Sequence, residues 1–171
     1  MDELAARVAA LEERVAGLSR RLDPTPTPTP APETPADDAL WALGALKARI
    51  DDGAGAVLFT GAVNLPTGEH YEWQSGRTVA DLLVEDWSDS AGVLSALAHP
   101  VRLLLLHRVL AGVRTAAELA DQEELGTSGQ LYHHLRQLVS AGWLRTPARG
   151  QYAVPGDRVV PLLVILAGTQ R

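Results

Sequence analysis

The sequence predicts a mainly α-helical protein with a small amount of β-structure, an α+β fold. Two observations predict helices: apolar residues recur every three or four positions over 128–141, and again over 40–50. A third predicts β-structure, because two apolar segments at 56–63 and 70–74 flank the turn sequence L-P-T-G. With 171 residues, 46% hydrophobic and 21% charged, the chain is long enough for one globular core with appendages.

Residues 1–23 are expected to form a coiled-coil helix. Their apolar positions alternate by four and three, with mostly valine at a and leucine at d of a heptad: Leu4, Val8, Leu11, Val15, Leu18 and Leu22. This choice favours a parallel two-stranded coil, so these residues are predicted to dimerise the chain. About three heptads are marginal for an isolated coil, so docking on the chain's own body is the alternative.

A proline- and threonine-rich linker is predicted at 24–37, beginning P-T-P-T-P-T-P. Proline lacks an amide hydrogen and fixes φ, so the segment should be extended polyproline II rather than helix or central strand. At about 3.1 Å per residue it holds the coil on the order of 40 Å from the body. We expect it either to reinforce the dimer or to let the coil reach another protein; a low-complexity linker without such a role is the alternative.

The segment 38–88 is predicted to be a helix, a β-hairpin and a second helix. The first helix has one apolar face, made by Leu40, Trp41, Leu43, Leu46 and Ile50. In the turn between the two strands, Pro66 suits the second position and Gly68 the fourth. Helical spacing resumes over 79–87.

Five of the eight aromatic residues of the chain fall in this middle segment: Trp41, Phe59, Tyr71, Trp73 and Trp87. Aromatic walls beside Glu72, Glu85 or Asp86 suit a cationic or planar small molecule, so a ligand pocket is one interpretation. The default interpretation is packing, in which these side chains hold the hairpin against the C-terminal region or a partner.

Two helices are predicted in the C-terminal region. Residues 115–122 form a short capped helix with Ala117, Leu119 and Ala120 for burial. In the second helix, 128–141, Thr127 is the expected cap and Gln130 completes a capping box. The spacing of the apolar residues predicts that one face of this helix packs in the core, and Gly142 is expected to end the helix. The apolar face consists of Leu131, Leu135, Leu138 and Val139.

A short hairpin is predicted at 145–154, with Pro147 and Gly150 in the bend and Tyr152 and Val154 on the return strand. A helix, a turn containing glycine, a second helix and a hairpin follow one another in winged helix-turn-helix domains. Residues 89–171 are therefore predicted to be such a domain.

Four stretches of this region resemble ArsR-type winged-helix transcriptional regulators: A-L-A-H-P-V-R-L-L-L-L at 96–106, T-A-A-E-L-A at 115–120, Y-H-H-L at 132–135 and A-G-W-L at 141–144. The resemblance covers about half of the chain. It implies a dimeric bacterial or archaeal DNA-binding protein, often a repressor that a metal or another inducer releases.

The predicted function is therefore sequence-specific binding of double-stranded DNA by a homodimer, with 128–141 in the major groove and 145–154 as the wing. Short or planar polar groups followed by an arginine suit base edges and phosphates. The predicted DNA-binding residues are Thr127, Ser128, Gly129, Gln130, Tyr132, His133, Arg136, Gln137, Arg145 and Arg149. Two dyad-related helices would read an inverted repeat. The alternative is a protein-interaction module that recruits a partner through the coil or the middle segment.

The charge distribution agrees with this function. The chain carries a net −6, but residues 91–171 hold eight arginines and five acidic residues, a net +3. The remainder, with seven basic and sixteen acidic residues, carries −9. The basic share falls where DNA contacts are predicted, and the acidic share discourages loose binding elsewhere.

The last helix is apolar on almost every side, which predicts burial on more than one face. It is expected to begin at or just before Val160, with Pro161 in its first turn. The resemblance implies that it joins the dimer interface through Leu162, Leu163, Ile165 and Leu166. Closure of the monomer's own core is the alternative.

Several classes of function are not expected. Without cysteine there is no disulfide or thiolate metal site, and the adjacent His133 and His134 diverge by about 100° on a helix, so no metal is predicted. No nucleophile, phosphate-binding or paired-carboxylate motif indicates an enzyme, and no cofactor is expected. A signal sequence and a membrane span are not predicted, so we expect a cytoplasmic, nucleoid-associated protein.

Overall fold

The computed structural model describes residues 40–51, 53–122 and 128–170, and the predicted coil and linker lie outside them. Contacts divide the chain into two compact units, Met1–Ala45 and Leu46–Arg171. Helix α2, Trp41–Lys47, begins in the first unit and buries none of its residues. The predicted apolar face is exposed at Leu40, Trp41 and Leu43 and half-buried at Leu46, and the helix ends before Ile50.

The second unit contains the predicted fold class, a mainly helical α+β arrangement with one two-stranded antiparallel sheet. Its elements, in chain order, are β1 Ala56–Asn64, β2 His70–Thr78, α3 Val79–Val84, the 3₁₀ helix η1 Trp87–Ser90, α4 Ala91–Ser95, α5 Pro100–Leu110, α6 Ala116–Ala120, α7 Ser128–Ser140 and α8 Gly156–Gly168. The helix predicted over 79–87 is thus shorter, and Trp87 opens η1 instead.

The predicted hairpin is confirmed. β1 and β2 pair from Ala56 with Thr78 to Asn64 with His70, and the amide of Gly68 donates to the carbonyl of Leu65 at 2.9 Å. Gly68 has φ +83°, a conformation that glycine adopts without steric penalty. The second strand continues four residues beyond the predicted 70–74, because its backbone keeps pairing with β1 where its side chains no longer alternate.

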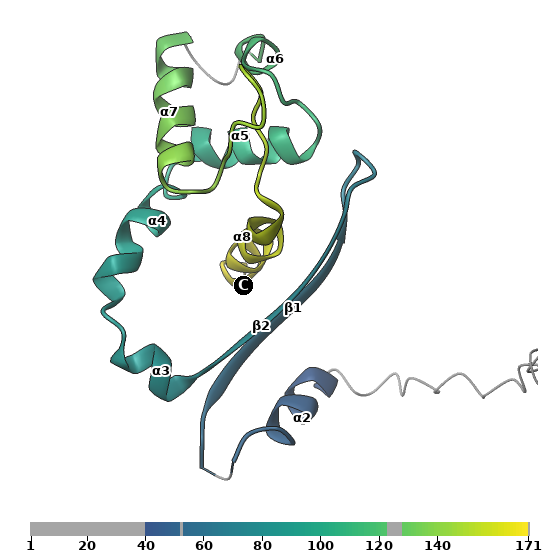
Figure 1. Cartoon of the computed structure of the whole chain (residues 1–171), viewed down its shortest axis with the longest axis vertical. Helices are drawn as coiled ribbons and strands as arrows, with labels where there is room; N and C mark the ends of the chain where they lie inside the picture. The colour runs from purple at the N-terminus through teal and green to yellow at the C-terminus, as the bar shows by residue number, and fades with distance from the viewer. Residues whose placement is uncertain (1–39, 52, 123–127, 171) are drawn as a thin grey trace, which may run out of the picture. The chain divides into compact units, whose positions relative to one another are not determined.

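The hairpin packs against α8, as the default interpretation of the middle segment expected. Figure 1 shows it as a long curved arm running beside this helix, which contacts both strands. Gly61 lies directly against Val160, and Tyr71 lies against Gly156. Because neither glycine carries a side chain, strand and helix approach closely at both points.

The hydrophobic core lies among α5, α6, α7 and α8. Trp143 is its largest fully buried side chain; its indole N–H donates to the carbonyl of Val93 at 2.9 Å, and the Arg158 guanidinium lies 5.3 Å from its ring centroid. The other members of this core cluster with at most 2% exposure are Leu105, Leu106, Val109, Leu119, Leu131, Leu135, Leu138, Leu144, Val159 and Leu162. The AGWL stretch therefore anchors the loop after α7.

Two local predictions were wrong. In α6 the buried residues are Ala116 and Leu119, whereas Ala117 and Ala120 are exposed, because the helix has only five residues and turns one edge inward. Helix α8 begins at Gly156, so Pro161 lies inside it. Proline there removes one intrahelical hydrogen bond. Burial of neighbouring apolar side chains offsets that loss.

Among the described residues, no single helix is long and apolar enough to cross a bilayer; the bent pair Trp87–Ser95 and Pro100–Leu110 reaches that length and composition only as two segments 74° apart. In the same part of the chain, no group of three or more histidine, aspartate or glutamate side chains is arranged to hold a metal ion.

Candidate nucleic-acid interface

Helix α7 has an apolar face and, opposite it, a polar face. Leu131, Leu135 and Leu138 are at most 1% exposed and face the core. The opposite face is exposed and carries Ser128, Gly129, Gln130, Tyr132, His133, Arg136 and Gln137. In Figure 1 this helix lies at the edge of the helical group, away from the hairpin. Seven of the predicted DNA-binding residues thus share one accessible surface.

The ends of α7 follow local sequence signals. It begins at Ser128, as predicted, while the expected cap Thr127 lies outside the described residues. It ends at Ser140, one residue before the predicted end, and Gly142 has φ +74°. The Trp143 amide donates back to the Leu138 carbonyl at 2.9 Å and that of Gly142 to Val139 at 3.1 Å, the bonding of a glycine-terminated helix.

Helix α6 is fixed at its start by a reciprocal cap. The Thr115 hydroxyl accepts a hydrogen bond from the Glu118 amide at 3.2 Å, and the Glu118 carboxylate accepts one from the Thr115 amide at 2.9 Å. The Thr115 hydroxyl also donates to this carboxylate at 2.7 Å, and this bond and then the one from the Thr115 amide lower the pKa of Glu118. The start of α6 is therefore fixed by its own first turn, and α7 is the next described helix along the chain.

Arg102 ties α7 to the helices behind it. From α5, one of its Nη atoms donates to the Gln137 side-chain oxygen at 2.8 Å and the other to the Ser95 carbonyl at 3.1 Å. Gln137 therefore takes part in positioning α7 as well as facing solvent. Arg102 was not among the predicted site residues; the signal was an arginine at the start of the apolar run of α5, which has a second arginine, Arg108, near its end.

The two adjacent histidines of α7 have different surroundings. His133 is exposed, whereas His134 is half-buried with its ring centroid 4.5 Å from that of His99. His99 caps α5, its Nδ1 accepting a hydrogen bond from the Val101 amide at 3.2 Å. Burial, and then the nearby His99, lower the pKa of His134. His134 is a packing residue that favours the neutral form.

Residues 145–154, here called the wing segment, turn back on themselves beside α6. Arg145 and Ala153 exchange two backbone hydrogen bonds of 2.8 and 3.0 Å, and Gln151 forms a second antiparallel bridge with Thr115. Gly150 has φ +71° in the loop between them, and Val154 is buried at its end. The segment is held by two isolated bridges rather than by regular strands.

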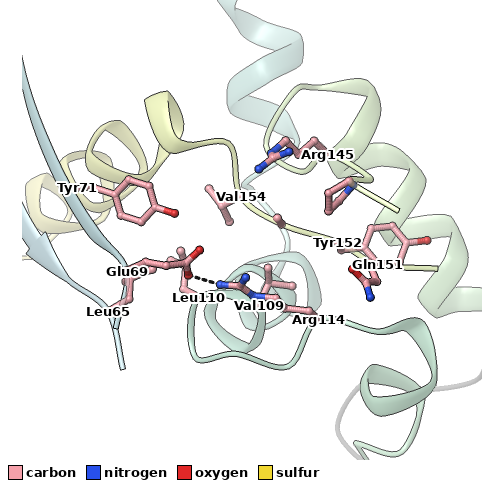
Figure 2. Close-up of a pocket in the computed structure, with 12 residues that line it drawn as sticks. Leu65, Glu69, Tyr71, Val109, Leu110, Arg114, Arg145, Gln151, Tyr152 and Val154 are labelled. Atoms are coloured by element: carbon pink, nitrogen blue, oxygen red, sulfur yellow. Dashed lines mark hydrogen bonds and ion pairs between the residues drawn. The ribbon is translucent and has the colours of Figure 1, made fainter. Parts of the chain in front are cut away.

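The two arginines of the wing segment differ in their surroundings. Arg149 is exposed in the loop. Arg145 is also exposed, but it lines a cavity between the hairpin and the wing segment, and Figure 2 shows its guanidinium turned toward that cavity. The side chain of Arg149 is therefore accessible to solvent, whereas that of Arg145 faces the cavity.

The remaining predicted site residues lie elsewhere. The six coil residues lie outside the described part of the chain. In α8, Leu162 is buried in the chain's own core, against which Leu163, Ile165 and Leu166 pack half-buried. Of the predicted aromatic pocket, Phe59, Tyr71 and Trp73 share the hairpin face toward α8. Trp87 is exposed and donates from its indole to the Leu82 carbonyl at 2.7 Å, and Trp41 is exposed on α2.

Comparison with known families agrees with this geometry. Residues 97–146 match a family model described as a helix-turn-helix domain. The chain contains a helix-turn-helix domain. The match extends from the residues just before α5, through α6 and α7, to the first residues of the wing segment. No curated protein matches the chain.

Proposed function

We propose that the chain is a DNA-binding transcription regulator that inserts α7 into the major groove. One observation carries the proposal: within the helix-turn-helix domain, α7 buries three leucines and exposes a continuous polar face. A helix held this way can enter a groove about 12 Å wide without disturbing the core.

The exposed face of α7 suits base and phosphate contacts. Ser128, Gly129 and Gln130 form its first turn, where recognition helices approach base edges. Arg136 follows two turns later, with its Nε donating to the Tyr132 carbonyl at 3.3 Å, so the side chain lies along the helix surface. We assign base or phosphate contact to Arg136 and backbone contact to Arg149 of the wing segment.

We further propose a homodimer that represses transcription at an inverted repeat, as ArsR-type regulators do. The predicted coil at 1–23, with its linker at 24–37, supports self-association. So do large apolar side chains exposed on α3, η1 and α4, namely Leu83, Val84, Trp87 and Leu94. Two recognition helices related by a dyad read half-sites about 34 Å apart.

Selection from a random pool of duplex DNA, using the full chain at near-physiological salt, tests the proposal. Enrichment of an inverted repeat is the expected result. On the enriched site, Arg136→Ala should weaken binding by about 1–3 kcal/mol, or roughly 5- to 150-fold. Arg77→Ala is the matched control, because it removes the same charge from an arginine that lies on the hairpin and is paired with Glu85. Equal losses in both variants, or no enrichment, would refute groove reading by α7.

The same exposed apolar residues favour a second candidate function, a module that recruits another protein through the middle segment. Val84 is 88% and Trp87 67% exposed, which is unusual for side chains of this kind. Two variants distinguish the two candidate functions: one lacks residues 1–35, and the other has serine in place of Val84 and Trp87. If the chain is such a protein-interaction module, these variants lose the ability to capture the partner protein, and Arg136→Ala has no effect on that capture.

A further inference from the structure

The cavity in Figure 2 lies where the hairpin, the end of α5 and the wing segment meet. Its volume is about 260 Å³. Ligand pockets for drug-sized molecules have about 300–1,000 Å³, so this one admits a smaller molecule. Apolar walls come from Leu65 and Tyr71 of the hairpin, Val109 and Leu110 of α5, and Tyr152 and Val154 of the wing segment. We propose that it binds a small organic monoanion, an aromatic carboxylate.

The charged side chains that line the cavity favour the binding of an anion. Arg114 is paired with Glu69, its Nη2 donating to a carboxylate oxygen. Hydrogen bonds from Thr67 and then Arg114 lower the pKa of Glu69, which keeps the carboxylate ionised. This pair is neutral as a unit. Arg145 has no carboxylate partner among the described residues, so its guanidinium is the uncompensated charge of the cavity.

Hydrogen-bond donors converge on the same space. Figure 2 shows the Tyr71 hydroxyl and the Arg145 guanidinium directed into the cavity from opposite walls. Burial raises the pKa of the Tyr71 phenol, so this hydroxyl remains protonated. The Nε of Arg114 is buried without a hydrogen-bond partner in the described part of the chain. The phenol also interacts with the Glu69 carboxylate, which contributes to its raised pKa, so the hydrogen bonds to the ligand come from Arg145. A guanidinium pairs with a carboxylate through two parallel hydrogen bonds.

The net charge of the lining selects a monoanion. One uncompensated guanidinium neutralises one negative charge, whereas a dianion would also approach the ionised Glu69. The apolar walls match the ring of an aromatic acid rather than inorganic phosphate. Among free anions, the cavity therefore favours one with a carboxylate at one end and an apolar body.

The position of the cavity links its occupant to the DNA-binding surface, a step that rests on the proposed function. Arg145 contributes both its guanidinium to the cavity and its backbone to the bridge that closes the wing segment. A ligand held by Arg145 therefore contacts the base of the wing. If its affinity depends on DNA being bound, then DNA affinity depends on the ligand by the same factor.

Titration calorimetry on the full chain, without DNA, tests the site itself. Benzoate and phenylacetate are the probes, with benzamide and phenylacetamide as neutral isosteres and inorganic phosphate as a third arm. We expect the two acids to bind at least tenfold more tightly than the amides and phosphate. Arg145→Gln should weaken acid binding at least tenfold, and Arg77→Gln, the same charge change at the far end of the hairpin, less than twofold.

Several results would overturn the site: no heat from either acid up to about 10 mM, equal binding of acids and amides, stronger binding of phosphate, or equal loss in both variants. Unchanged circular dichroism of Arg145→Gln confirms that the variant is folded. DNA affinity is then measured with and without saturating benzoate. A site that binds acid while DNA affinity stays constant overturns the link to the wing and leaves the site standing, so the two failures are distinguishable.

Discussion

Substitution of Gly61 by alanine tests the docking of the hairpin on α8. A Cβ at this position would lie 2.7 Å from Val160 Cγ1 and 3.3 Å from Cγ2. Val160 is 1% exposed and β-branched, so it has little freedom to turn away. Overpacking of this kind costs about 1–3 kcal/mol.

Gly76 is the matched control on the other strand. A Cβ there would lie 3.4 Å from Leu58 Cδ1, an ordinary contact, and neither glycine has positive φ. Replacing glycine in a strand gains about 0.5–1 kcal/mol from the reduced entropy of the unfolded chain. We therefore expect Gly76→Ala to be neutral or slightly stabilising, and Gly61→Ala to lower the free energy of unfolding by roughly 1–2 kcal/mol.

Urea unfolding, followed by circular dichroism and tryptophan fluorescence, measures both changes. Combining Gly61→Ala with Val160→Ala removes the clash, so the double-mutant cycle should give a coupling of about 1 kcal/mol. Equal effects of the two glycine substitutions, or a coupling of zero, would show that the hairpin does not rest on Val160 and would refute the reasoning.

Three further predictions concern the helix-turn-helix domain. Thr115→Ala removes the cap of α6 and should cost about 1 kcal/mol in urea unfolding. Trp143→Ala should cost about 3–5 kcal/mol in the same assay, because it empties a fully buried site. Burial lowers the pKa of His134 below its ordinary 6.5, so the unfolded chain takes up the proton first and stability falls as pH drops below that value. The fall in urea midpoint between pH 7.5 and 5.5 should shrink in His134→Gln and persist in His133→Gln.

Sequence reasoning succeeded where a few adjacent residues decide the structure. The capped start of α6 at Thr115, the turn from Leu65 to Gly68 and the end of α7 at Gly142 are all closed by hydrogen bonds within a few positions. The three leucines on one face of α7 also follow from spacing alone. Helix α7 was therefore predictable nearly to the residue.

Features that depend on distant pairs were not predictable in the same way. The Arg114 to Glu69 pair joins residues 45 positions apart, and Arg102 reaches Gln137 across 35. No local sequence pattern indicates either contact. The cavity combines three such distant segments, so its residues could not be assembled from spacing. The aromatic residues drew attention because of their type, yet of the five only Tyr71 lines this cavity.

These distant contacts also change how the charge of the C-terminal region is interpreted. The net charge of +3 in this region includes arginines whose side chains make contacts within the fold. Arg102 donates to Gln137, Arg114 is paired with Glu69, and Arg158 lies over Trp143. Arg136 and Arg149 remain exposed on α7 and on the wing segment. Arg145 is exposed as well, but it lines the cavity beside the hairpin. Few arginines of the described part of the chain are therefore left to contact DNA phosphates, so the electrostatic contribution to any DNA binding should be small. If the chain binds DNA as proposed, specificity then depends mainly on hydrogen bonds from the polar face of α7, which is why the matched removal of charge at Arg136 and Arg77 is a decisive comparison.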